Sequence, residues 1–404
     1  MRPSLRPILV TALAASLLAA GCSAAGTGSG DDRADGGAAP AGEIGEPATT
    51  AESTTTTEPF VPRSLTIGAS GDILIHAPVQ RSAAANAGGV GFDFDPMFDD
   101  VREMITASDL ALCHQETPIS ADNTNLSVPN TLSFNAPREL ANALVNAGFD
   151  GCDTASNHTW DRTLTGVQQT NEVFDSVGLR HVGGAGSEAE MLAPPIYQVK
   201  GVQVGHLAYS YTVFNNFGPN TQFPPEAPWM QKMLWPVVGV EGILADAAAI
   251  KARGAELVVV SMHWGDQYIA QPTADQVRLA EALLASPDVD LILGDHVHVT
   301  QPCQKVNDKY VIYGMGNFLS NQAPGQASGL TPENQDGAYY QWSFTETAPG
   351  VFATTAMTFA PTAVQTQGHK ILRSLPTTNA ASYDRTVKWV GLLGPEACDA
   401  VPAY

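Results

Sequence analysis

Short apolar runs alternate with amphipathic segments along most of the chain. An apolar run at residues 65–70 is followed by residues 95–108, in which Met97, Val101 and Ile105 recur at helical spacing, and then by a second apolar run at residues 110–113. This order predicts a β-α-β opening. The same alternation predicts helices over residues 137–146, 164–176, 239–253 and 274–285, with strands over residues 149–154, 180–182, 257–262 and 289–293.

The remaining pattern is richer in strands. Residues 196–199 and 202–210 predict a hairpin, whereas residues 215–236 are rich in Pro and Asn and predict a long loop. Further strands are predicted over residues 311–313, 339–345 and 352–359. Because helices and strands occur in this mixed order, we predict an α/β fold in which two sheets pack together with helices outside them.

The first 60 residues differ from this pattern. Residues 1–21 carry Arg2 and Arg6, then an apolar run, then small residues before Cys22, which is typical of an export signal. The segment ending at Cys22 resembles a bacterial lipobox, so we expect cleavage there and a lipid anchor on the Cys22 thiol. That anchor would place the protein at the outer face of the bacterial cytoplasmic membrane; a plain secreted protein and an uncleaved anchor are the alternatives.

Residues 22–60 contain few large apolar side chains and predict a flexible tether rich in Thr, Gly and acidic residues. We therefore expect residues 61–404 to form the folded domain. With 44% hydrophobic residues in 404, the chain can bury a large core. Its formal net charge of −21 argues against nucleic acid as a partner, because binding to phosphates depends on basic patches.

Four cysteines remain after Cys22, in a compartment that permits disulfides. Cys113 and Cys152 lie on predicted strands that precede polar signatures. We therefore expect the pairs Cys113 with Cys152 and Cys303 with Cys398, with free buried thiols as the alternative.

Six polar signatures follow predicted strands, and they contain six of the nine histidines. They are GDILIH (71–76), HQE (114–116), SNHTWD (156–161), HWG (263–265), GDHVH (294–298) and GNF (316–318). In α/β sheets ligands sit beyond the carboxyl ends of strands, so these side chains are expected to form one site. Their carboxylate, amide and imidazole groups are the mixture that divalent metals used for hydrolysis require.

The individual residues of these signatures differ in how strongly they indicate a functional site. His296 and His298 are two positions apart and would point the same way if extended. His158 can act as a general acid oriented by Asp161, although Asp161 also fits a helix N-cap. His76 reaches the site only if its strand continues past Leu74.

The ordered set resembles the capsule synthesis protein CapA family, also called poly-γ-glutamate biosynthesis proteins, within the calcineurin-like metallophosphatases. The resemblance covers about residues 65–322. It implies a four-layer α/β/β/α sandwich of two mixed sheets and two divalent metal ions (manganese, iron, zinc or magnesium). The implied metal ligands are Asp72, Glu116, Asn157, His263, His296 and His298, with His158 as the proton-transfer residue.

The sequence departs from the family pattern at four places. His114 stands where the family usually has Asn, and Thr163 stands where Gly is expected. Gln267 replaces a common Glu, and Asp295-His296-Val297 replaces His-His-Pro. None of these changes removes an implied ligand, but His114, Gln267 and Asp295 are positioned to alter metal choice or substrate.

Two functions are consistent with these residues. The first is a surface-anchored metal-dependent hydrolase of a phosphoester or of a γ-glutamyl bond in an anionic capsule polymer. The second is a non-catalytic export or anchoring protein that contacts the polyanion through its metals, alongside the membrane components of a capsule synthase. A solute-binding lipoprotein would share the signal and the tether but would not need imidazoles clustered at strand ends.

Overall fold

The computed structural model describes residues 60–215 and 218–403. The predicted export signal, the lipobox and all but the last residue of the predicted tether lie outside the described residues. Within the described residues, we find no helix that is both long enough and apolar enough to cross a bilayer.

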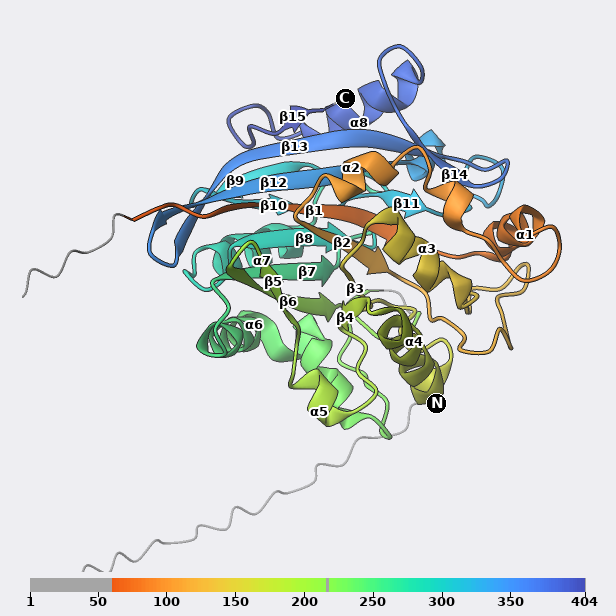
Figure 1. Cartoon of the computed structure of the whole chain (residues 1–404), viewed down its shortest axis with the longest axis horizontal. Coiled ribbons are helices and arrows are strands. Elements are labelled where there is room, and N and C mark those ends of the chain that lie inside the picture. The colour runs from red at the N-terminus through yellow and green to blue at the C-terminus, as the bar shows by residue number, and fades with distance from the viewer. Residues whose placement is uncertain (1–59, 216–217, 404) are drawn as a thin grey trace, which may run out of the picture. The chain divides into compact units, whose positions relative to one another are not determined.

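The first sheet has nine strands and is mixed. Strands β1 to β4 run parallel to one another, and β12, β13 and β14 continue the sheet antiparallel on the other side of β1. β11 also pairs with β1, and β15 pairs with β13 (Figure 1). The strands are β1 (Ser64–Ile73), β2 (Leu110–Gln115), β3 (Gly151–Asp153), β4 (Arg180–Val182), β11 (Asn317–Leu319), β12 (Asp336–Ala348), β13 (Val351–Gln365), β14 (Lys370–Arg373) and β15 (Val401–Pro402).

The second sheet has six strands and is also mixed. Its order is β5-β6-β7-β8-β10-β9; the four central strands are parallel, and the two edge strands are antiparallel to their neighbours. The strands are β5 (Ile196–Val199), β6 (Val202–Ser210), β7 (Leu257–His263), β8 (Leu291–Asp295), β9 (Cys303–Val306) and β10 (Lys309–Ile312).

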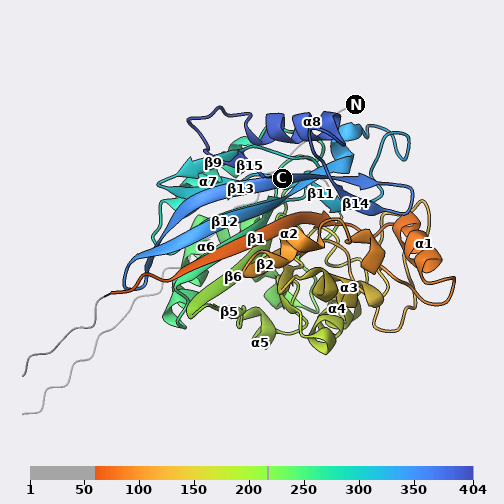
Figure 2. The same ribbon diagram turned by 45° about the horizontal axis from the view of Figure 1, so that its top comes forward.

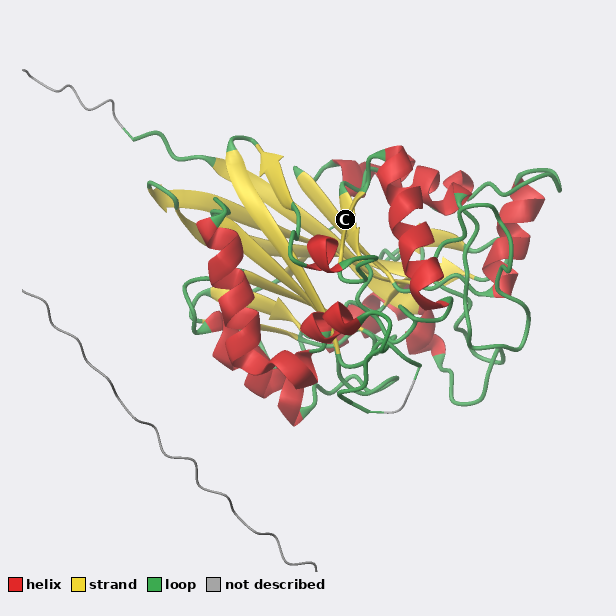
Figure 3. Cartoon of the chain, turned by 90° about the horizontal axis from the view of Figure 1, so that it is seen from below, coloured by secondary structure: helices red, strands yellow, loops and turns green. Residues whose placement is uncertain are grey.

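Helices cover the outer faces of the two sheets (Figure 3). The first sheet's outer face packs against helices α1 to α4, and the second sheet's outer face packs against α6 and α7. Figure 2 shows α8 on the β13 side, where it packs against β12 and β13. The helices are α1 (Ala77–Asn86), α2 (Arg102–Thr106), α3 (Glu139–Ala147), α4 (Thr163–Val177), α5 (Glu188–Met191), α6 (Trp235–Ala252), α7 (Ala274–Leu284) and α8 (Ala380–Val390), with short 3-10 turns η1 (Asp95–Met97), η2 (Pro228–Met233) and η3 (Pro332–Gln335).

A third apolar core lies between the sheets. It joins Leu65 and Leu112 of the first sheet to Val259 and Leu293 of the second. The order of layers is therefore helix, sheet, sheet, helix, which confirms the predicted α/β sandwich. Figure 1 shows the arrowheads of β1, β2, β7 and β8 at the same end of the sandwich, so the residues that follow these strands meet there.

Two predicted helices differ from the structure. Residues 95–108 form η1 and the five-residue α2 instead of one helix. α6 starts at Trp235 rather than at 239, and Gly239 interrupts it with φ 64, a left-handed conformation that glycine adopts without a side-chain clash. The sequence patterns also missed α1, α5 and α8, and they missed the short strands β9, β11, β14 and β15.

Both expected disulfides are present. Cys113 and Cys152 face each other in register on the parallel strands β2 and β3, with Cα atoms 4.4 Å apart. Cys303 at the start of β9 joins Cys398 near the C-terminus, with Cα atoms 5.8 Å apart. The first bridge therefore links two strands that lead to the polar signatures, and the second fixes the C-terminal segment to the second sheet.

Candidate metal centre

Asp72 is placed by the close approach of β1 to Gly316, the residue before its parallel neighbour β11. A Cβ atom at Gly71 would lie 2.0 Å from the carbonyl oxygen of Gly316, so the chain tolerates only glycine there without moving apart. The Asp72 amide donates to the same Gly316 oxygen at 3.0 Å. This close approach holds the Asp72 carboxylate at the carboxyl end of β1, where it is fully buried.

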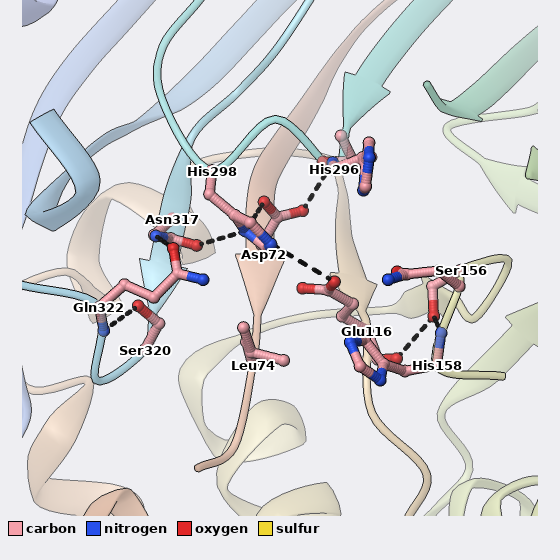
Figure 4. A network of polar contacts seen from close by, with 12 residues as sticks. Asp72, Leu74, Glu116, Ser156, His158, His296, His298, Asn317, Ser320 and Gln322 are labelled. Carbon is pink, nitrogen blue, oxygen red and sulfur yellow. Dashed lines mark hydrogen bonds and ion pairs between the residues drawn. The ribbon is translucent and has the colours of Figure 1, made fainter. Parts of the chain in front are cut away.

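Two further predicted ligands, Glu116 and His298, lie close to Asp72. Donor atoms of Asp72, Glu116 and His298 all lie within 4.8 Å of one another (Figure 4). Nδ1 of His298 is 2.9 Å from Asp72 Oδ2, and its Nε2 is 3.7 Å from Glu116 Oε1. Two carboxylates and an imidazole at these separations form a set that can hold a divalent ion.

The other three predicted ligands lie together beside this group. Nε2 of His263 is 2.9 Å from Oδ1 of Asn157, and the His263 and His296 rings are 4.6 Å apart at their centroids. The amide of Asn157 is further fixed by donating to Asn215 Oδ1 at 3.1 Å. The structure thus brings all six predicted ligands to one end of the sandwich.

The two histidines of GDHVH reach the site in a different way from the one predicted. β8 ends at Asp295, and His296 and His298 have φ values of 91° and 56°, so the segment is not extended. The His296 amide donates to Asp72 Oδ1 at 3.2 Å, which ties this turn to β1. Left-handed backbone at non-glycine residues is strained and is concentrated at functional sites.

His158 stands beside the six ligands without joining them. Its Nδ1 is 2.8 Å from Asp161 Oδ2, and its amide donates to the Ser156 hydroxyl at 2.9 Å. The Ser156 hydroxyl in turn donates to the Glu116 carbonyl at 2.7 Å. Asp161 does not cap α4, whose N-cap is Arg162 with no side-chain cap, so the orienting role for Asp161 is the one that fits the geometry.

His76 does not extend β1 toward the site. The strand ends at Ile73, and His76 is the N-cap of α1. Its Nδ1 lies 3.2 Å from the Leu74 carbonyl and 3.4 Å from the Asn321 amide, and its ring packs edge-on against Phe134. The chain turns after β1 because the strand gives way to a helix with proline in its first turn.

Burial and neighbouring charges set the protonation of the ligands. Burial raises the pKa of Glu116, whereas the pKa of Asp72, which burial alone would raise, is held below its ordinary value by His298. Against the effect of burial, Glu116 and Asp72 raise the pKa of His298 to about 9. Burial, followed by the charge of His298, lowers the pKa of His296 to about 3, and burial together with His296 lowers the pKa of His263 well below its ordinary value. His263 and His296 are therefore neutral at pH 7, whereas His298 has to give up a proton when it binds a metal ion.

The unsatisfied atoms of the site fit a divalent cation. Among the described residues, both Glu116 carboxylate oxygens, Nδ1 of His263 and Nδ1 of His296 are buried without a hydrogen-bond partner. A buried polar atom without a partner costs about 1–3 kcal/mol. Several such atoms at one place, all lone-pair donors, fit a bound cation better than a packed core.

Sequence reasoning missed three features of the site. His114 was noted only as a departure, yet it forms donor groups with Asp72 and His263 and with Asp153 and Asp295. Asn317, from the GNF signature, places Oδ1 3.1 Å from His298 Nδ1. Tyr268 stacks its ring on His298 at 5.9 Å, and no motif in the sequence pointed to it. The unusual imidazole at position 114 and the GNF signature were the available signals.

A cavity of about 600 Å³ lies elsewhere, against β4, α5 and α6. Its walls include Arg180, His181 and Lys232, and they contain none of the predicted site residues.

The chain is similar to known capsule proteins. The family model described as "Bacterial capsule synthesis protein PGA_cap" matches residues 66–322. "PGA biosynthesis protein CapA" of Bacillus subtilis (strain 168) is 25% identical over 262 residues, which are 65% of this chain and 64% of that protein. "Capsule biosynthesis protein CapA" of Bacillus anthracis is 28% identical over 231 residues, which are 56% of this chain and 54% of that protein. The chain thus spans less than two thirds of the length of these relatives.

Solved structures with a similar arrangement include phosphoesterases. The calcineurin-like phosphoesterase YfkN from Bacillus subtilis aligns with 81% of this chain and 99% of its own at 15% identity and a TM-score of 0.42. The Haemophilus influenzae NAD nucleotidase NadN aligns with 80% of this chain and 55% of its own at 12% identity and a TM-score of 0.40. Both TM-scores are below 0.5, so the architecture rests on the strand pairing described above. Because the family model matches well over half of its length, the chain belongs to the bacterial capsule synthesis protein family PGA_cap.

Proposed function

We propose that this protein is a divalent-metal-dependent hydrolase that acts on an anionic capsule polymer. The scissile bond is a phosphoester or a γ-glutamyl amide. The observation that carries this proposal is the His158–Asp161 pair, at 2.8 Å, beside a cluster of buried metal-ligand side chains. A site that only binds a polyanion has no need of an oriented imidazole that can transfer a proton.

The proposed ligands divide into two sets. Asp72, Glu116 and His298 would hold one ion, and Asn157, His263 and His296 would hold the second. Two divalent ions supply a Lewis acid and lower the pKa of a bound water, which generates a nucleophile near neutral pH. Manganese, iron, zinc and magnesium are the candidates, and the imidazoles favour the first three over magnesium.

The chain's own proton chemistry is proposed for His158. Asp161 accepts from Nδ1, which fixes the ring orientation. When the ring is protonated on both nitrogens, Nε2–H is then the group that delivers a proton to the leaving oxygen or nitrogen, and the ring is left neutral with its proton on Nδ1. Phe134 supports this arrangement in two ways: its amide donates to the same Asp161 oxygen at 2.6 Å, and its ring packs edge-on against His158 at 4.7 Å.

The net charge of the chain and the descriptions of its relatives both support an anionic polymer as the substrate. A chain with net charge −21 offers few cations, so a polyanion would be met at the metals rather than at a basic surface. Two relatives are described as capsule or PGA biosynthesis proteins, which supports an acidic capsule polymer as the partner. We also propose, from the sequence of residues 1–22, that the protein is exported and lipid-anchored at Cys22, close to the membrane components of a capsule synthase.

A second candidate function is non-catalytic polymer handling. Each of the six proposed ligands is at most 4% exposed, so a polymer would meet the bound metals rather than the ligand side chains. In this candidate function the metals contact the polyanion without cleaving it, and the protein helps to export or anchor the polymer.

Activity assays on metal-loaded protein separate these two candidates. Phosphodiester and γ-glutamyl substrates are assayed with and without manganese on the wild type, on His158→Ala and on His181→Ala, a control histidine outside the site. We expect metal-dependent turnover that His158→Ala lowers by about 10²–10⁴-fold while its metal content stays unchanged. Metal-loaded wild type that hydrolyses neither substrate would support polymer handling instead.

A further inference from the structure

A second cluster of buried ionisable groups lies directly against the proposed metal ligands. His114 on β2 and Asp153 on β3 are paired in register, and Nδ1 of His114 is 2.7 Å from Asp153 Oδ1. Asp295, at the end of β8 in the other sheet, places Oδ2 3.9 Å from the same nitrogen. All three side chains are almost completely buried. The cluster therefore spans the two sheets just inside the strand ends.

The free side of the His114 ring faces the proposed ligands. Nε2 is buried, has no hydrogen-bond partner among the described residues, and lies 3.9 Å from Asp72 Oδ1. The His114 ring is 4.9 Å from the His263 ring between centroids. Donor atoms of Asp72, His114 and His263 all lie within 4.8 Å of one another.

This arrangement leaves Nε2 of His114 and the carboxylate of Asp72 close together with no hydrogen bond between them. With Nδ1–H donating to Asp153, Nε2 of His114 faces the carboxylate of Asp72, and it presents a lone pair there when a metal ion takes the place of its proton. Two lone-pair-bearing atoms at this distance in a dry interior repel each other unless positive charge lies between them. The unpartnered Nδ1 of His263 adds a third donor to the same place.

We propose that His114 is an additional metal ligand through Nε2, together with Asp72 and His263, and that Asp153 is the carboxylate that orients it. An imidazole whose second nitrogen donates to a carboxylate is the usual arrangement of a metal-bound histidine. This inference rests on the proposed function, because it requires that the centre binds metal, and it adds a ligand to the six that the family resemblance implies.

Asp295 belongs to the same cluster of buried ionisable groups. The family pattern has Asn at position 114 and His at position 295, whereas this chain has His114 and Asp295, and these two side chains face each other. The imidazole has thus moved to the opposite sheet, and a carboxylate now stands where an imidazole is expected. The extra nitrogen ligand would shift metal preference away from magnesium, which favours oxygen ligands, toward zinc and iron.

Metal binding tests this without any need for activity. Zinc and magnesium affinities are measured by titration on the full chain for the wild type, His114→Asn, Asp153→Asn and His206→Asn. His206 is the matched control, since it is also completely buried but bonds the Ser261 hydroxyl and belongs to none of the donor groups. We expect His114→Asn to weaken zinc binding by about 100-fold and magnesium binding far less, Asp153→Asn to weaken zinc binding by about 10-fold, and His206→Asn to change neither by more than about twofold.

X-ray absorption of the zinc-loaded wild type gives a measurement that does not depend on whether a variant folds. Four imidazoles shared between two ions are expected, whereas the ligands implied by the family resemblance alone supply three. A count of three, or a His114→Asn protein that binds zinc within twofold of the wild type, would overturn the inference and leave the proposed function intact. A wild type that binds no divalent metal would instead overturn the proposed function itself.

Discussion

Nδ1 of His158 lies 2.8 Å from Oδ2 of Asp161, although the two residues are only three positions apart and neither belongs to a helix. The same Asp161 oxygen accepts the Phe134 amide at 2.6 Å, so the carboxylate is fixed from two directions. An oriented imidazole next to a set of metal ligands is the feature that favours chemistry over binding alone.

Asp161→Asn tests this orientation. An amide in place of the carboxylate can present its NH₂ group to Nδ1 and thereby favour the wrong tautomer of His158. We expect kcat to fall by about 10-fold or more, short of the loss in His158→Ala, with KM and metal content little changed. Steady-state kinetics and metal analysis on the same preparations check this.

The control for Asp161→Asn is Asp175→Asn. Asp175 also pairs with a histidine, His181, at 3.3 Å, but it is largely exposed and lies away from the donor cluster. Equal losses of kcat in both variants would contradict an orienting role for Asp161.

Thr163→Gly is expected to stabilise the protein. Thr163 begins α4 with φ 57, is exposed, and makes no side-chain hydrogen bond among the described contacts. A left-handed backbone conformation destabilises a residue with a Cβ atom by about 1–2 kcal/mol, and glycine avoids this strain. Glycine also loses more conformational entropy on folding, which offsets about 0.5–1 kcal/mol of the gain. We expect the free energy of unfolding to rise by about 0.5–1 kcal/mol in urea titrations.

Thr165→Gly is the matched control for that change. Thr165 is exposed two positions further along the same helix and has an ordinary helical φ, so its replacement should lower the free energy of unfolding by about 0.5 kcal/mol. If both variants shifted stability in the same direction, strain at Thr163 would not be the cause.

Much of the sheet architecture could be predicted from the sequence, because buried strands are continuous apolar runs. The hairpin of β5 and β6 has the bounds that the pattern predicted. α1 could not be predicted in the same way, since its sequence APVQRSAAAN has few large apolar residues to show a helical period. β11 has three residues, too few for any period to appear.

The site, like the fold, could be predicted from the sequence only in part. Residue types and chain order predicted that Asp72, Glu116, Asn157, His263, His296 and His298 meet, because parallel strands present their carboxyl ends at one edge. Side-chain direction could not be predicted, since it depends on backbone angles such as the φ of 91° at His296. The Cys113–Cys152 pairing was predictable from strand position, whereas the contact between His114 and Asp295 depends on how the two sheets pack.

Glu346 gives a pH dependence with a definite sign. Its carboxylate accepts from Arg63 Nε at 2.8 Å, and this bond lowers the pKa of Glu346 from 4.5 to about 2. Because the folded pKa lies below the ordinary value, this contribution to stability is complete above about pH 4.5 and is lost as the pH falls toward 2. Urea midpoints measured between pH 7 and pH 2 should fall less steeply in Glu346→Gln than in the wild type over that window.

Glu241→Gln serves as the control for the pH series. Glu241 is an exposed residue of α6 and forms no ion pair among the described residues. Its profile should follow that of the wild type. A Glu346→Gln profile that also did so would show that the Arg63 contact contributes nothing to acid stability.

The two disulfides are expected to have separable effects. The Cys303–Cys398 bridge closes a 95-residue separation and fixes the C-terminal segment, where the Lys305 amide also donates to the Ala397 carbonyl at 2.7 Å. The double variant Cys303→Ser with Cys398→Ser should lose about 2–5 kcal/mol of unfolding free energy, because a long cross-link restricts the unfolded chain. Its metal affinity should stay unchanged, since neither cysteine lies near the donor cluster.

The Cys113–Cys152 bridge adjoins the site and should behave differently. Cys113 precedes His114 on β2, and Cys152 precedes Asp153 on β3, so the bridge fixes the spacing of the strands that hold this pair. The double variant Cys113→Ser with Cys152→Ser should therefore lose both stability and metal affinity, the latter by about 10-fold, as is common when the support of a ligand is loosened. Calorimetry and zinc titration on both double variants measure the two effects, and equal zinc affinities would show that the β2–β3 spacing is set by packing rather than by the bridge.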